Sequence, residues 1–306
     1  MQIIRPLVLT VALTAPILVH ADVDLRQEHT FDARPGQTLV IDVSFHRVEV
    51  LVEPGSTVHA VVELSTRSSG GRAERAIEEY RPVFQEKGDT LLIRSVKKRG
   101  WSWKSPNLKG RVTVTMPPDL DLSVDSSSGS ITIEGDLGDG EVSCDASSGS
   151  VTADGTMRSF RSDTSSGSTR VSVSRPLELF SADSSSGSIR LEGGAHKARA
   201  DASSGSIWLD GLLGDAAMDT SSGSITAQWD AVPAGASIDA GASSGSITLR
   251  LPAGTVLSGS VDTSSGGIRS DFPGTFKRSS ATFNGGAGAV ELQADTSSGS
   301  VKILEN

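Results

Sequence analysis

The residues best suited to chemistry are aspartates that recur in a short motif, D-x-S-S-G. The motif occurs nine times, and eight copies carry an aspartate four residues before the glycine, among them Asp125, Asp145, Asp163, Asp183, Asp201 and Asp219. Ca²⁺ takes several oxygen ligands, so one interpretation is a row of divalent-cation sites. The other is that each aspartate accepts hydrogen bonds from the serines and backbone N–H groups of its own corner. We favour hydrogen bonding, because water and salt also screen exposed carboxylates, and we expect no bound metal or cofactor.

A second candidate is a basic and aromatic segment, residues 97–111, which holds six basic residues and no acid. Its glycines and proline indicate a loop, and two tryptophans spaced two residues apart would share one side of an extended segment. Such a loop suits an anionic envelope partner, such as an acidic glycan, a lipid headgroup or a phosphate polymer. The alternative is a solvated hairpin tip whose rings pack on the protein surface. The candidate binding residues are Trp101, Trp103, Lys97, Lys98, Arg99 and Lys104.

A third candidate is a set of arginines and one tryptophan within the repeats. They fall at positions that should point outward, and we expect them on connected faces: Arg161, Arg170, Arg190, Arg199 and Trp208. An aromatic ring beside guanidinium groups suits acidic sugars. Ordinary variety on the outer face of a strand is the alternative.

The repeat predicts the fold that must position these residues. Its glycines are Gly129, Gly149, Gly167, Gly187, Gly205, Gly223, Gly245, Gly266 and Gly299. A period of about 20 residues is the signature of a solenoid. Apolar residues alternate on both sides of the motif, so each coil has two short strands with one buried face, and the motif is the corner between them. An Asx-turn at the aspartate and a positive φ at the glycine would suit that corner. We predict an all-β, single-stranded parallel β-helix, right-handed by the crossover preference of parallel strands.

The predicted domain organisation follows from where the repeat begins. Residues 1–21, with an apolar stretch at 6–19, are typical of a cleaved signal peptide, and a membrane-tethered N-terminus is the alternative. Residues 22–306 form one solenoid domain, in which 22–120 are irregular first coils with a cap and 121–306 are the repeat coils. Residues 71–80 are the helix candidate, and residues 271–290 are a long loop or a bulged coil. No second apolar run is long enough to span a bilayer.

Composition and motif content exclude several classes of protein. The formal net charge of −9 argues against binding a nucleic-acid backbone. The histidines are scattered, and no H-E-x-x-H, G-x-S-x-G or C-x-x-C motif occurs. Catalysis needs one distinctive constellation, whereas aspartate and serine recur in every coil, so we expect no enzyme. The single cysteine, Cys144, allows no internal disulfide and falls in an inward column, so we expect it to be buried.

The order of features resembles a bacterial family. The matching stretches are F-D-A-R-P-G-Q-T-L-V-I-D (31–42), G-D-T-L-L-I (88–93), V-T-V-T-M-P-P-D-L-D-L (112–122), the S-S-G-S-I repeats, and G-G-x-G-x-V (285–290). They resemble the putative-adhesin family of unknown function with β-strand repeats, which is related to the head domain of putative auto-transporter adhesins. The resemblance implies a single-stranded right-handed β-helix at the cell envelope, with no catalytic residues to carry over.

Three functions of different class remain. The first, which we favour, is a non-enzymatic exported protein, adhesin-like, that binds a glycan or a protein at the envelope. The second is a structural or envelope-stress spacer, and the third is a β-helix polysaccharide lyase or hydrolase. The sequence leaves open the ligand, the oligomeric state, and whether the protein stays in the periplasm or reaches the cell surface.

Overall fold

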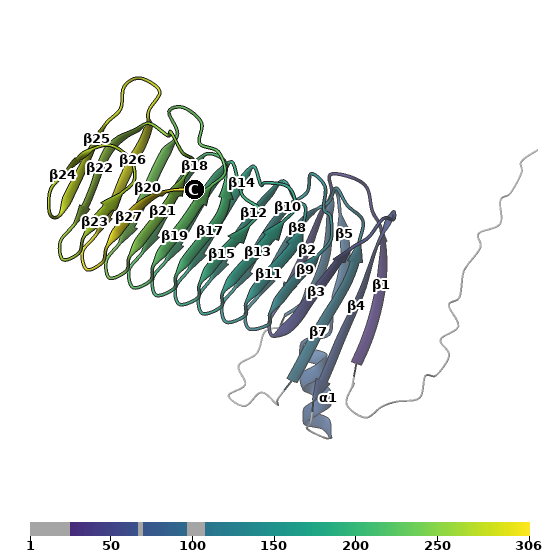
Figure 1. Ribbon diagram of the computed structural model, residues 1–306. Coiled ribbons are helices and arrows are strands. Elements are labelled where there is room, and N and C mark those ends of the chain that lie inside the picture. The colour runs from purple at the N-terminus through teal and green to yellow at the C-terminus, as the bar shows by residue number, and fades with distance from the viewer. Residues whose placement is uncertain (1–24, 67–69, 97–107) are drawn as a thin grey trace, which may run out of the picture.

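A computed structural model describes residues 25–66, 70–96 and 108–306. The described chain forms a rod of two long β-sheets that face one another, with one helix at the wide end (Figure 1). Sheet A has the strand order β1 (Leu25–Asp32), β4 (Thr57–Thr66), β7 (Leu108–Met116), β3 (His46–Val52), β9 (Ile131–Glu134), β11 (Val151–Gly155), β13 (Thr169–Val173), β15 (Ile189–Glu192), β17 (Ile207–Leu212), β19 (Ile225–Trp229), β21 (Ile247–Leu251), β27 (Val301–Glu305) and β23 (Ile268–Ser270).

Sheet B contributes the other strand of each coil. Its order is β24 (Thr275–Phe276), β25 (Ser280–Asn284), β22 (Leu257–Thr263), β26 (Val290–Thr296), β20 (Ser237–Ala242), β18 (Asp215–Thr220), β16 (Lys197–Ala202), β14 (Leu179–Ser184), β12 (Ser159–Thr164), β10 (Glu141–Ala146), β8 (Asp121–Ser126), β2 (Thr38–Val43), β6 (Thr90–Ser95) and β5 (Val83–Lys87). Repeat coils pair parallel and in register, as in Val142 of β10 beside Leu122 of β8 and Phe160 of β12. The predicted parallel β-solenoid is confirmed.

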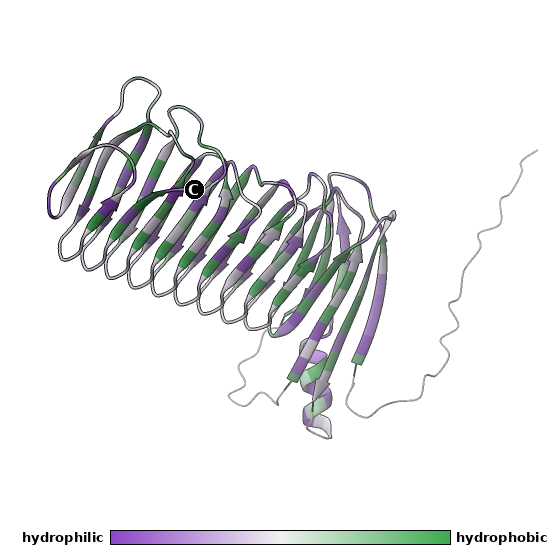
Figure 2. Cartoon of the chain, viewed as in Figure 1, coloured by the Kyte–Doolittle hydropathy of each residue, from purple (hydrophilic) through white to green (hydrophobic). Residues whose placement is uncertain are grey.

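The core lies between the two sheets and consists of columns of like residues. Polar and apolar residues alternate along the strands (Figure 2), as expected when one face of each strand is buried. Cys144 stands in one of these columns and is fully buried, as predicted, and burial raises the pKa of its thiol. Two polar side chains in the core form a hydrogen bond with each other. The hydroxyl oxygens of Ser162 in sheet B and Thr169 in sheet A lie 3.0 Å apart.

Most corners of the repeat coils are held by the residue after the aspartate position, not by the aspartate itself. In six repeat coils this residue is a buried serine or threonine: Ser126, Thr164, Ser184, Thr220, Thr263 and Thr296. The Thr220 hydroxyl accepts from the backbone N–H of Gly223 at 3.1 Å and donates to the carbonyl of Gly205 in the neighbouring coil at 2.9 Å. One hydroxyl therefore closes its own corner and joins it to the next.

The expected positive φ at the motif glycines is wrong. None of the nine has a left-handed backbone. Instead, a Cβ added to Gly187 would collide with the carbonyl oxygen of Gly167 in the neighbouring coil, and the other motif glycines repeat this geometry. Glycine is required because the corners of successive coils stack in close contact.

The coils are not stacked in chain order at either end of the rod. The last coil, β26 and β27, is inserted between the β20–β21 coil and the β22–β23 coil. The segment before it is neither a plain loop nor a bulged coil, because β25 pairs antiparallel with β22 and with β24, and so covers the end of sheet B.

The N-terminal end is built in a related way. The first coil, β2 and β3, lies between the β8–β9 coil and a later coil formed by β6 and β7. Antiparallel strands β4, β1 and β5 complete the wide end, and the predicted helix is α1 (Gly71–Glu79). Among the described residues, no helix has the length and apolar character needed to cross a membrane. The predicted signal peptide lies outside the described residues and stays a prediction.

Candidate functional site

Three of the predicted site residues stand side by side on the outer face of sheet A. Arg170 of β13, Arg190 of β15 and Trp208 of β17 occupy the same register position on successive strands. Parallel strands lie about 4.8 Å apart, so the three side chains project from neighbouring points on one face. The column continues as threonine on both sides, with Thr152 of β11 and Thr226 of β19.

The geometry of this group is fixed by two contacts of Arg190. Its guanidinium carbon lies 3.9 Å from the centre of the Trp208 ring, and its Nε lies 2.6 Å from Oε1 of Glu192. Stacking of a guanidinium on an indole is favourable, and the carboxylate holds the guanidinium in that position. We call Arg170, Arg190, Glu192 and Trp208 the Arg–Trp patch.

Arg170 differs from Arg190 in that no described acidic side chain compensates its charge. It is exposed, and it forms no ion pair with any residue that the structure describes. The patch therefore presents one organised cation on an aromatic ring and one free cation beside it. Sequence reasoning missed Glu192, although its position two residues after Arg190 places it on the same outward face.

Arg161 and Arg199 do not join the patch, contrary to the expectation of connected faces. They lie on β12 and β16 of sheet B and flank Ser181 of β14. Because the inner faces of sheets A and B share one core, their outer faces point in opposite directions. Alternation along a strand identifies outward residues, but it does not say which sheet a strand joins.

The aspartates form one column on the outer face of sheet B, in unbroken register from Asp42 through Asp125 to Asp219. The expected hydrogen bonds to their own corners are absent among the described residues, because the following serine or threonine takes that role. Partial burial, followed by the charges of Asp125 and Asp163, raises the pKa of Asp145. The described residues contain no group of three or more histidine, cysteine or acidic side chains placed to hold a metal ion.

The basic, aromatic segment is described only at residues 108–111, which begin strand β7 where the sequence predicted a loop. Trp101, Trp103, Lys97, Lys98, Arg99 and Lys104 lie outside the described residues, so their role stays a prediction.

Comparison with known families gives a match over most of the chain. The model of the family described as Toastrack DUF4097 matches residues 37–304. The chain belongs to the Toastrack family. The resemblance to the putative-adhesin family is thereby confirmed, and the matched residues include every strand of the Arg–Trp patch. No curated protein matches the chain.

Several solved structures are similar to the chain at low sequence identity. A protein described as a putative lipid-binding protein from Parabacteroides distasonis is 16% identical, with 92% of this chain and 97% of that chain covered and a TM-score of 0.51. A putative adhesin from Parabacteroides merdae is 13% identical, with 92% and 97% covered and a TM-score of 0.46. A putative adhesin from Bacteroides fragilis is 14% identical, with 92% and 98% covered and a TM-score of 0.45. At 16% identity, the likeness to the first of these structures shows the fold alone.

Proposed function

We propose that this Toastrack protein is an exported, non-enzymatic, adhesin-like module that binds an acidic glycan at the cell envelope through the Arg–Trp patch. The observation that carries the proposal is the Arg190 guanidinium stacked 3.9 Å over the Trp208 ring, with the free Arg170 on the next strand. Aromatic rings bind the apolar faces of sugars, and guanidinium groups bind carboxylates in a paired geometry.

The surroundings of the patch suit a long, flat ligand. A column of exposed serines runs beside it along sheet A, and the Ser168 hydroxyl accepts from the backbone N–H of Ser188 at 3.1 Å. Hydroxyl groups at the spacing of successive strands offer repeated polar contacts to a polymer with repeated hydroxyls of its own. A spacer would gain nothing from leaving Arg170 without a counter-charge.

The repeated architecture argues against an enzyme. The motif aspartates of sheet B repeat one position from coil to coil, whereas a general acid and a general base need two carboxyl groups in different environments. We therefore place binding above polysaccharide cleavage.

Binding to polygalacturonate, with neutral dextran as the control polymer, tests the proposal. Arg170→Gln should weaken binding about tenfold, the size of one charge-assisted hydrogen bond. Trp208→Thr, which copies the threonines of the neighbouring strands, should weaken it similarly. Arg250→Gln removes the same charge from β21 of the same sheet and is the matched control, because β21 lies four strands beyond Arg170 and two strands beyond Trp208. Equal losses in all three variants, or equal binding to dextran, would refute a role for the patch.

A further inference from the structure

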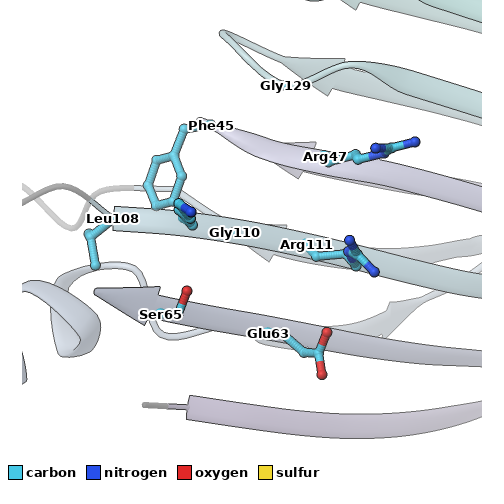
Figure 3. Close-up of a pocket in the computed structure, with 9 residues that line it drawn as sticks. Phe45, Arg47, Glu63, Ser65, Leu108, Gly110, Arg111 and Gly129 are labelled. Carbon is cyan, nitrogen blue, oxygen red and sulfur yellow. The ribbon is translucent and has the colours of Figure 1, made fainter. Parts of the chain in front are cut away.

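A hollow of about 460 Å³ opens at the N-terminal end of the rod, on the outer face of sheet A (Figure 3). Strands β3, β7 and β4 line it. Arg47 of β3 stands beside Arg111 of β7, and on the other side of β7 Glu63 and Ser65 of β4 stand beside Arg111 and Lys109. Phe45, just before β3, also lines the hollow. Three basic side chains thus surround one hollow, separated from the Arg–Trp patch by strands β9 and β11.

The charges around the hollow are unbalanced. Arg47 forms an ion pair with Glu49, with Nε and Oε1 2.8 Å apart. Glu63 forms an ion pair with Arg26, with Oε1 and Nε 3.4 Å apart. Lys109 and Arg111 form no ion pair with the described residues. Arg47 and Arg111 stand directly opposite each other on β3 and β7, where like charges are destabilising, and Glu63 of β4 stands opposite Arg111 on its other side.

Two residues that line the hollow have no room for a side chain, because His46 packs against them. A side chain at Gly110 would collide with the His46 ring, and one at Gly129 would collide with the His46 carbonyl. Both residues therefore have to be glycine, and both line the hollow. Neither residue adds a side chain to the lining of the hollow.

One wall of the hollow is apolar and held in place. The Phe45 ring stacks on His46 with centroids 4.6 Å apart and meets Tyr80 edge-on at 4.9 Å. Leu108, which is half-buried, adds a second apolar side chain. A ligand could therefore place an anionic group against the cations and a flat apolar part against Phe45.

We propose that this hollow is a binding site for a phosphate group carried on a flat or apolar stem. A phosphate ester has up to two charges and three strong acceptor oxygens, which match Lys109, Arg111 and Arg47 with the Ser65 hydroxyl as a further donor. A carboxylate has one charge and two oxygens, so it would leave more of this set unused. The site does not depend on glycan binding at the Arg–Trp patch.

Phenyl phosphate is the first probe, with benzoate and phenol as matched controls for the charge and the ring. Titration of the full chain, followed by NMR or calorimetry, should show saturable binding of phenyl phosphate, weaker binding of benzoate and none of phenol. Arg111→Gln and Lys109→Gln should each lower the affinity about tenfold or more, as expected for charge-assisted hydrogen bonds. Arg250→Gln and Arg170→Gln, on the same sheet outside the hollow, should leave it unchanged. The melting temperature of each variant checks that it folds.

Two further arms distinguish the sources of the phosphate. Sedimentation with phosphatidic acid vesicles, against phosphatidylcholine vesicles, tests a lipid headgroup, and titration with glucose 1-phosphate tests a soluble sugar phosphate. Either response, if lost in Arg111→Gln, supports the site and names the source. The proposal is overturned if phenyl phosphate does not saturate, or if Arg250→Gln weakens binding as much as Arg111→Gln.

Discussion

At the scale of single residues, the motif glycines determine how closely the coils can stack. The missing Cβ of Gly187 points at the carbonyl oxygen of Gly167, and that of Gly205 points at the carbonyl oxygen of Gly187. A methyl group at one of these positions must push two coils apart while the parallel strands on either side hold them together. The strain cannot be relieved by a side-chain rotation, because the atoms that would collide belong to the backbone.

Gly187→Ala should therefore destabilise the protein by about 1–3 kcal/mol, the usual cost of overpacking. Gly286→Ala is the matched control, since a Cβ there would lie in open space and its backbone is not left-handed. Urea unfolding of both variants measures the difference. A Gly187→Ala variant as stable as Gly286→Ala would show that the coils can separate freely at the corner.

The same positions show what the sequence could and could not predict. Periodicity located the nine corners and the inward columns, because burial imposes a residue type at each recurring position. It did not reveal why the glycines are needed, since the colliding atoms belong to a coil about 20 residues away. Likewise, the aspartate is the most regular polar residue of the motif, yet the variable serine or threonine after it makes the corner hydrogen bonds.

At the scale of elements, the N-terminal cap is organised around one buried histidine. His46 of β3 is fully buried, and its Nε2 lies 3.1 Å from the Ser95 hydroxyl of β6, which also donates to the Tyr80 carbonyl after α1. Its Nδ1 has no hydrogen-bond partner among the residues that the structure describes. Burial lowers the pKa of His46 to about 4. The histidines are scattered in the sequence, so no pattern marked this one as a junction between three elements.

His46 predicts a loss of stability in mild acid. In the unfolded chain the His46 ring binds a proton at about pH 6.5, whereas in the folded protein the ring stays neutral down to about pH 4. Unfolding is therefore favoured as the pH falls through this window, by about 3 kcal/mol in total. His46→Gln should lose less stability than the parent between pH 7 and pH 4, and the exposed His59→Gln should behave as the parent does.

An NMR titration gives an independent measurement if His46→Gln does not fold. The His46 ring signals of the parent should not titrate above about pH 5. The comparison with variants is needed because protonation of the aspartate column changes the stability in the opposite direction to protonation of His46. The raised pKa of Asp145 makes the folded state bind protons more readily as the pH falls, which favours folding. A His46 that titrates near pH 6.5 would contradict the buried, neutral ring.

At the scale of the whole molecule, insertion of a coil at each end secures both ends of the rod. The last coil pairs on both sides, and the backbone N–H of Asn306 donates to the carbonyl of Leu251 at 3.0 Å. Chain ends normally fray, whereas here the C-terminal strand lies inside a sheet. The repeat could not predict this order, because all coils carry the same residues at the same positions and any two of them can stack in register.

Disulfide cross-linking tests the coil order directly. Lys302 of β27 lies beside Thr248 of β21, whereas Arg269 of β23 lies one strand farther away. Neighbouring strands are about 4.8 Å apart, and a disulfide needs Cα atoms within about 7 Å. The pair Thr248→Cys with Lys302→Cys should therefore oxidise readily, and Thr248→Cys with Arg269→Cys should not. Buried Cys144 should not compete, because burial raises its thiol pKa and removes it from solvent. If the second pair forms the faster disulfide, the coils stack in chain order and the inserted coil is wrong.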